Sequence, residues 1–211
     1  MQSGNGSKNS AAIQVLFGSG ERMAIGRGLA ELRAGRPLMI VGADDAPERP
    51  LLALPAEGLQ AASLRALSEF VAPSQLRLVL SASRAGAIGQ AVRGPLRFEL
   101  PAAIDASAIL ALVGAPVVMS ELKGTPASVL EKAGVRLMKL AQLLPALLVA
   151  DVPPERRPAM CRLAVQVEAS AIGGFLKAST GSLSIASEAF VPLESDRKST
   201  RLNSSHANVS R

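Results

Sequence analysis

The sequence predicts an α/β (α+β) domain in which helices pack on a layered, mixed sheet. Short apolar runs of strand length alternate with longer stretches that carry apolar residues at helical spacing. Glycine and proline separate most of these segments. Alternating strands and helices are typical of layered domains with a single core.

The first part of the chain contains two predicted helices and two predicted strands. Residues 21–35 have apolar side chains at helical spacing, and Gly35 ends the pattern. Apolar runs at 38–41 and 51–54 predict buried strands, and an acidic turn at 42–50 joins them. Residues 59–70 again show the spacing of a helix.

The middle of the chain continues the alternation. Residues 76–80 predict a strand, after which Ser81 or Ser83 caps a helix that runs to Val92. Residues 96–100 predict a further strand. Asp105 is a suitable N-cap for a helix over 106–112.

The strongest helical pattern covers residues 128–144, and Pro145 is expected to end it. Residues 146–149 predict another buried strand. Pro153 and Pro154 then interrupt the chain before a helical or mixed region that extends to Phe175.

The carboxyl-terminal residues do not resemble a protein segment. Residues 196–206 (DRKSTRLNSSH) are similar to one reading frame of a sequencing-library adapter, and 207–211 to the sequence that follows it. We expect 196–211 to be an artefact tail, to be left out of any assessment of charge. Without it the chain loses four Lys/Arg, one Asp and its single His, so the net charge falls from +6 to +3.

The remaining chain does not suit nucleic-acid or membrane binding. It has no Trp or Tyr, and its arginines are scattered rather than gathered in a basic stripe. No apolar run approaches the roughly 20 residues that span a bilayer. Residues 1–10 are polar and unlike a signal peptide. We therefore expect a cytoplasmic protein.

A single cysteine limits the chemistry of the chain. Cys161 alone makes neither an intramolecular disulfide nor a multi-cysteine zinc site. Its neighbours Met160, Leu163 and Val165 are apolar and predict a buried, inert thiol.

Four segments resemble known enzymes of riboflavin synthesis. Residues 30–41 (AELRAGRPLMIV) resemble the opening helix and strand of 3,4-dihydroxy-2-butanone 4-phosphate synthase, and 137–149 (LMKLAQLLPALLV) its late helix and following strand. Residues 78–89 (LVLSASRAGAIG) and 141–146 (AQLLPA) are more similar to the amino-terminal region of a proteobacterial GTP cyclohydrolase II. In that family a degenerate synthase-like domain precedes the catalytic domain. Residues 186–193 (ASEAFVPL) resemble the segment that leads into it.

Together with the polar leader and the adapter-like tail, this resemblance divides the chain into four segments. They are a disordered leader at 1–20, a synthase-like domain at 21–180, the start of a truncated cyclohydrolase domain at 181–195, and the artefact tail at 196–211. It also implies a parent enzyme that converts GTP to a diaminopyrimidine phosphate, formate and pyrophosphate.

The catalytic groups of such a parent are not in these residues. The family's zinc site has three cysteines, and its metal lowers the pKa of a bound water. With Cys161 alone, and no His outside the tail, we assign no catalytic, cofactor-binding or metal residue to this chain. Zinc and GTP are expected only for the full-length parent. We expect an inactive domain that forms a homo-oligomer or contacts its own catalytic domain.

An acidic loop offers a weaker alternative. The synthase family holds a divalent ion with an acidic loop and a late Gly-His-Thr-Glu segment. Here Asp44, Asp45 and Glu48 carry oxygen ligands that suit Mg²⁺, but the same residues are typical of a surface turn, which we favour. Residues 131–136 (EKAGVR) contain neither His nor Thr.

Two further patterns have ordinary structural interpretations. The glycines at 18–20 and 26–28 lack a complete phosphate-loop fingerprint, so leader and helix-surface glycines are expected. Arg156 and Arg157 either bind a phosphate or a partner's carboxylate or, more commonly, lie in a solvated loop.

Two alternatives to the cyclohydrolase assignment stay open. One is a stand-alone, non-catalytic oligomerisation or binding module. The other is a working 3,4-dihydroxy-2-butanone 4-phosphate synthase, which rests on the acidic loop alone.

Overall fold

The computed structural model describes residues 14–16, 18–43, 48–72, 75–101, 103–114 and 123–181. Residues Met1–Lys177 form one compact unit, and Ala178–Arg211 are assigned to a second. Residues 1–13 and 17 of the predicted leader at 1–20, the residues after Gly181 and the predicted artefact tail at 196–211 lie outside the described residues. The rest of the predicted leader is described: 14–16 are helical, and Gly20 begins a helix that Ser19 caps.

A mixed sheet of seven strands forms the centre of the first unit, counted over the described residues. The spatial order is β5-β4-β3-β6-β2-β1-β7, in which β1 and β7 are parallel and all other neighbours are antiparallel. The strands are β1 Leu38–Val41, β2 Leu51–Pro55, β3 Arg77–Leu80, β4 Leu96–Glu99, β5 Thr125–Pro126, β6 Ala146–Asp151 and β7 Gln166–Glu168.

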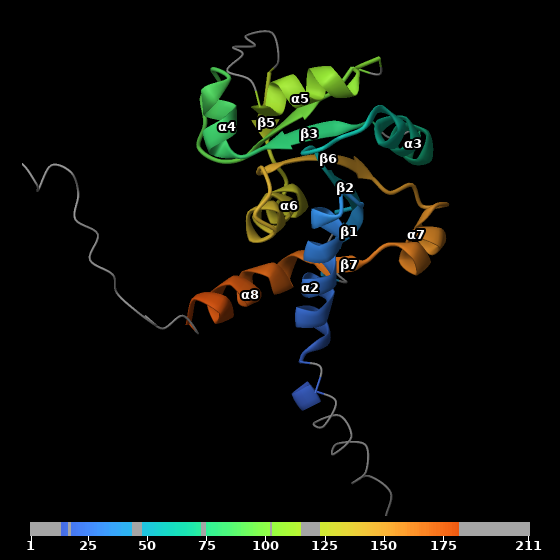
Figure 1. Cartoon of the computed structure of the whole chain (residues 1–211), viewed down its shortest axis with the longest axis vertical. Coiled ribbons are helices and arrows are strands. Elements are labelled where there is room, and N and C mark those ends of the chain that lie inside the picture. The colour runs from blue at the N-terminus through green and yellow to red at the C-terminus, as the bar shows by residue number, and fades with distance from the viewer. Residues whose placement is uncertain are drawn as a thin grey trace, which may run out of the picture. The chain divides into compact units, whose positions relative to one another are not determined.

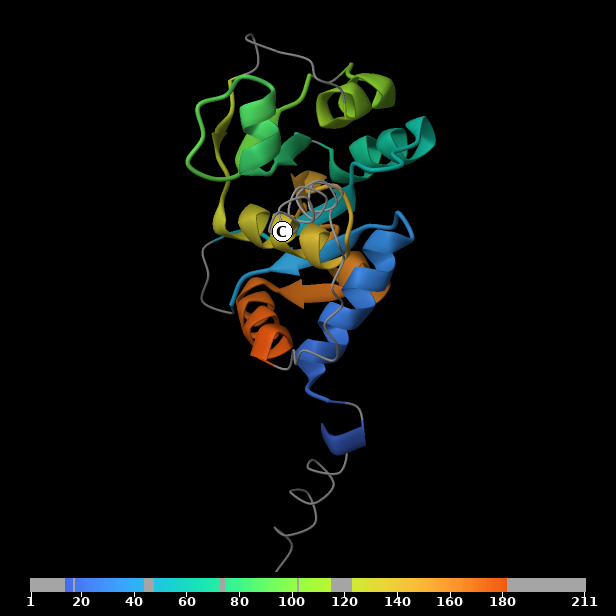
Figure 2. The same cartoon turned by 60° about the vertical axis from the view of Figure 1, so that its left-hand side comes forward.

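Helices cover both faces of this sheet, as Figures 1 and 2 show. One face packs against α2, α6 and α8 and the other against α3, α4, α5 and α7, and each face has its own apolar cluster. The helices are α2 Gly20–Arg33, α3 Ala61–Val71, α4 Ala82–Ala87, α5 Ala106–Gly114, α6 Val129–Leu140, α7 Arg157–Leu163 and α8 Ala169–Gly181.

Strand β6 shows how the sequence makes two cores. Side chains alternate between the faces of a strand. Leu148 and Ala150 therefore join the cluster on the α3 side, whereas Leu147 and Val149 join the cluster on the α6 side. The run of consecutive apolar residues at 146–150 is therefore explained, because β6 is buried on both faces of the sheet. The predicted layered α/β fold with a mixed sheet is confirmed.

The predicted helix over 128–144 ends earlier than expected, at Leu140. Gln142 has a positive φ of 60°. The Gln142 N–H donates to the Lys139 carbonyl at 3.1 Å, and the Leu143 N–H donates to the Met138 carbonyl at 3.0 Å. These two bonds form a Schellman motif, which satisfies the last carbonyls of the helix before Pro145 is reached.

The predicted helix that runs to Val92 is also too long. Ser81 caps it, since its Oγ accepts a hydrogen bond from the Arg84 N–H, but the helix ends at Ala87. Gly89 follows with a φ of 88°, a left-handed conformation that a helix does not continue through.

The glycines at 26–28 do not share one environment. Gly26 is exposed on α2, as predicted, but Gly28 is buried. A Cβ at Gly28 would lie 2.8 Å from Val167 Cγ2 and 3.2 Å from Leu38 Cδ2. The prediction of a surface glycine is therefore wrong for Gly28, because α2 approaches the sheet closely at this point.

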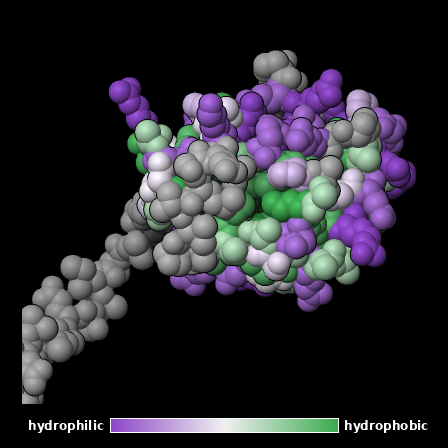
Figure 3. All heavy atoms as spheres, turned by 90° about the horizontal axis from the view of Figure 1, so that it is seen from above, coloured by the Kyte–Doolittle hydropathy of each residue, from purple (hydrophilic) through white to green (hydrophobic). Residues whose placement is uncertain are grey.

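The end of the unit that carries α4 and α5 is largely hydrophilic, and hydrophilic side chains border a hydrophobic patch on it (Figure 3). Leu110 of α5 is 38% exposed. Apolar exposure of this extent is ordinary on protein surfaces.

Among the described residues, no helix is both long and apolar enough to cross a bilayer.

Candidate functional site

The candidate site is a polar cluster on the α6 face of the sheet. In β3, Leu78 and Leu80 join the apolar cluster on the opposite face, so Arg77 points toward α6. In β4, Leu96 and Phe98 likewise face away, which leaves Arg97 on the α6 side. The sheet is therefore polar where β3 and β4 pass the beginning of α6.

The first turn of α6 supplies a carboxylate to this cluster. Ser128 and Glu131 form a capping box: Ser128 Oγ accepts a 3.3 Å hydrogen bond from the Glu131 N–H, and Glu131 Oε2 accepts a 2.7 Å bond from the Ser128 N–H. Glu131 is only 1% exposed. The capping box therefore fixes a buried carboxylate in one position.

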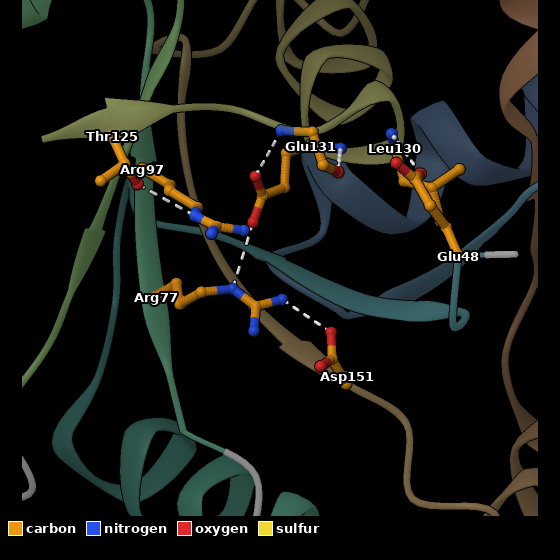
Figure 4. A network of polar contacts seen from close by, with 8 residues as sticks. Glu48, Arg77, Arg97, Thr125, Leu130, Glu131 and Asp151 are labelled. Carbon is orange, nitrogen blue, oxygen red and sulfur yellow. Dashed lines mark hydrogen bonds and ion pairs between the residues drawn. The ribbon is translucent and has the colours of Figure 1, made fainter.

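Arg77 joins this carboxylate to a second one, as Figure 4 shows. Its Nε donates to Glu131 Oε1 at 3.1 Å, and its Nη2 donates to Asp151 Oδ1 at 2.7 Å. Asp151 ends β6 and is about one-third exposed, so the network extends from the core to solvent.

The surroundings of Arg77 favour its charged form. Burial of the guanidinium lowers the pKa of Arg77, but the hydrogen bond and charge of Asp151 and the charges of Glu131 and Glu99 outweigh burial. The net effect is a raised pKa. Arg77 is therefore a permanent cation between two carboxylates.

Two contacts frame the network. Glu48 Oε2 accepts a 3.3 Å hydrogen bond from the Leu130 N–H, which ties the loop before β2 to the start of α6. Arg97 Nε donates to Thr125 Oγ1 at 3.0 Å and joins β4 to β5 (Figure 4).

The arrangement does not fit a divalent cation between its carboxylates. Among the described residues, Glu131 and Asp151 are the carboxylates that bind Arg77, and its guanidinium already lies between them. Within the described ranges, no three His, Cys, Asp or Glu side chains form a metal-binding group. In the same ranges, no buried side-chain polar atom lacks a hydrogen-bond partner.

Of the three acidic residues in the predicted loop, only Glu48 belongs to the described part of the chain. Asp44 and Asp45 lie outside the described residues. Glu48 is described, and its carboxylate caps the start of α6. The choice between a magnesium ligand and a surface turn for the whole loop stays a prediction.

The structure also tests two predictions about single residues, Cys161 and Arg156. Cys161 is exposed, so the predicted buried thiol is wrong. On the short helix α7 it is Met160 that faces the core, and the next side chain points away from it. Arg156 is exposed in the turn before α7, in agreement with the predicted solvated loop, and its guanidinium lies 5.4 Å from the centroid of the Phe70 ring.

Sequence reasoning did not identify Arg77, Glu131 and Asp151 as a group. The spacing from Ser128 to Glu131 is a capping-box signature that could have placed the carboxylate at the start of α6. A charged residue directly before the apolar run 78–80 is a second signal. Their meeting with Asp151 depends on the pairing of β3 with β6.

No family model and no curated protein matches the sequence. Solved structures do match in fold. A 3,4-dihydroxy-2-butanone 4-phosphate synthase in complex with two magnesium ions has a TM-score of 0.58 and 13% identity over 75% of this chain and 99% of its own. The Candida albicans synthase has a TM-score of 0.54 and 14% identity over 72% and 96%.

A two-domain synthase from A. baumannii is a further match. Its TM-score is 0.55 and its identity 17%, over 72% of this chain. The match spans only 57% of that two-domain protein. These likenesses show that the chain has the fold of 3,4-dihydroxy-2-butanone 4-phosphate synthase.

Proposed function

We propose that this chain is a non-catalytic, synthase-fold domain from the amino-terminal part of a GTP cyclohydrolase II, an enzyme of riboflavin synthesis. The observation that carries the proposal is the position of Arg77. Its guanidinium binds Glu131 and Asp151 at once, so the two carboxylates that converge on the α6 face stabilise the fold instead of holding a metal or a substrate.

The energetics of the network suit a structural role. A buried carboxylate that lost its cationic partner would carry a large desolvation cost. Glu131 is nearly inaccessible and also completes the capping box of α6. A ligand that displaced the Arg77 guanidinium from Glu131 would therefore disturb the start of α6 as well as the ion pairs.

The link to a cyclohydrolase rests on the sequence resemblance at 78–89, 141–146 and 186–193. A two-domain neighbour supports it, because there the synthase fold is part of a longer chain. Cys161 is the one cysteine in the sequence, so zinc and GTP would bind a domain outside these 211 residues. The partner of this domain would be that catalytic domain or a second copy, in the cytoplasm.

The test of inactivity is a formate assay with ribulose 5-phosphate and Mg²⁺ on the complete chain. We expect no formate above the level without enzyme, whereas an authentic synthase, run in parallel, releases it. Formate release that depends on the chain would overturn the proposal.

Long-read sequencing of the gene across the codons for residues 193–199 tests whether the chain comes from a GTP cyclohydrolase II. We expect the frame to continue past Ser195 into a cysteine-rich segment without the adapter-like residues 196–211. A genomic frame that encodes Asp196 to Arg211, with no cysteine-rich cyclohydrolase frame after Leu193, would contradict it.

An active 3,4-dihydroxy-2-butanone 4-phosphate synthase is the second candidate. The solved neighbours named above are synthases, which favours it. It would rely on Asp44 and Asp45 for its acidic ligands, together with Glu48. The formate assay separates it from the first candidate.

A further inference from the structure

A pocket of about 500 Å³ opens on the opposite face of the sheet from the polar cluster. Leu52 and Leu54 of β2 form its floor, Leu67 and Phe70 of α3 one wall, and Met160 of α7 another. Both helices pack on this face of the sheet (Figure 1). The volume lies within the range of small-molecule sites.

The lining of the pocket is mainly apolar. Its floor and inner walls belong to the buried cluster of this face, and Leu163, at 81% exposure, extends the apolar surface to the rim. A ligand that fits it would therefore bury a hydrocarbon or aromatic body, with a gain proportional to the apolar area removed from water.

Two guanidinium groups lie close to the pocket and have different partners. Arg36 lines the pocket, whereas Arg156 does not line it and is placed near it by its contact with Phe70, a lining residue. Arg36 forms a two-bond ion pair with Glu31, so its charge is already balanced. Arg156 lies over the Phe70 ring at 5.4 Å from the centroid. Within the described part of the chain, its guanidinium has no hydrogen-bond acceptor and no ion-pair partner.

We propose that this pocket binds a small amphipathic anion. The apolar body of the ligand contacts Leu52, Leu54 and Met160, and its carboxylate binds the guanidinium of Arg156. The Phe70 ring holds that guanidinium beside the opening by a cation–π contact. A cationic ligand would be repelled by the Arg156 guanidinium, and a neutral ligand would form no charge-assisted hydrogen bond with it.

The probe for this site is decanoate, with decanol as its uncharged counterpart, measured by titration calorimetry on the complete chain. We expect saturable binding of decanoate with one ligand per chain, and decanol to bind roughly five-fold or more weakly. An absence of saturation up to about 1 mM decanoate would overturn the proposal.

Three variants separate the charge from the cavity. Arg156→Gln should weaken decanoate binding roughly five-fold to ten-fold and leave decanol binding unchanged. Ala66→Trp, at an exposed lining position of α3, should abolish binding of both. Arg136→Gln removes the same charge from an exposed position of α6, on the other face of the sheet, and should change neither affinity.

Two results would contradict the assignment of the anion to Arg156. One is equal decanoate affinity in the wild type and in Arg156→Gln. The other is equal loss in Arg156→Gln and Arg136→Gln, which would indicate a response to net charge alone. Neither result bears on the formate assay, so this inference and the proposed function are tested separately.

Discussion

Arg77 Nε donates a 3.1 Å hydrogen bond to Glu131 Oε1 and so joins β3 to the first turn of α6, although 54 residues separate the two in sequence. The other oxygen of the same carboxylate accepts the Ser128 N–H. One buried side chain therefore holds a helix start and a sheet strand together. Its removal should affect both local and tertiary structure.

Glu131→Ala tests this coupling. The substitution removes the capping-box acceptor and one of the two carboxylates that balance the buried Arg77 charge. We expect a loss of about 2–4 kcal/mol in the free energy of unfolding, measured by urea denaturation followed by circular dichroism. Glu69→Gln, at an exposed position of α3, is the control and should change stability by less than about 0.5 kcal/mol. Similar losses in the free energy of unfolding for Glu131→Ala and Glu69→Gln would show that the network does not stabilise the fold.

Two glycines on α2 form a matched pair. Gly28→Ala would place a Cβ 2.8 Å from Val167 Cγ2, and β-branched valine has little rotamer freedom with which to yield. We expect a loss of about 1–2 kcal/mol from overpacking. Gly26→Ala meets no heavy atom within 4 Å and should gain about 0.5–1 kcal/mol from helix propensity. Equal effects at both positions in urea denaturation would contradict the close packing of α2 on β7.

The elements that could be predicted are those whose signal is local. The apolar run at 38–41 lies between Pro37 and Gly42, and it forms β1 with the same bounds. Ser128 and Asp105 begin helices because their side chains accept backbone N–H groups three residues on. Such patterns depend on neighbouring residues alone, so the sequence displays them.

The elements that could not be predicted depend on partners. β5 has two residues and β7 three, and each is a strand only because β4 or β1 pairs with it. The end of α6 was placed too late because a left-handed residue other than glycine, Gln142, ends the helix.

The candidate site was missed for the same reason. Arg77 and Asp151 are 74 residues apart, and the pairing of β3 with β6 brings their strands together.

The exposed thiol of Cys161 predicts rapid chemical labelling. A buried thiol reacts only after local or global unfolding. Because Cys161 is exposed, we expect 5,5′-dithiobis(2-nitrobenzoate) to react with one thiol per folded chain, at a rate within roughly ten-fold of that in urea. Cys161→Ser should give no reaction. Protection of the native thiol by a larger factor would favour the burial that the neighbouring apolar residues predict.

The cap of α5 gives stability that depends on pH. Asp105 Oδ1 accepts hydrogen bonds from the Ala108 N–H at 2.7 Å and from the Ser107 hydroxyl at 2.8 Å, and these bonds lower the pKa of Asp105. An acidic group whose pKa is depressed in the folded state stabilises the fold at pH values above its unfolded-state pKa. This stability is lost as the pH falls through the folded-state pKa.

Asp105→Asn isolates the contribution of this cap, because asparagine keeps the acceptor oxygen and does not titrate. The wild type should be more stable than the variant at neutral pH, and the difference should vanish as the pH falls from about 5 to about 2. Urea denaturation of both proteins across this range measures it. Other acidic groups with a lowered pKa, such as Glu31 beside Arg36, are present in both proteins and cancel in the difference. A difference that stays constant with pH would mean that the charge of Asp105 does not contribute to the start of α5.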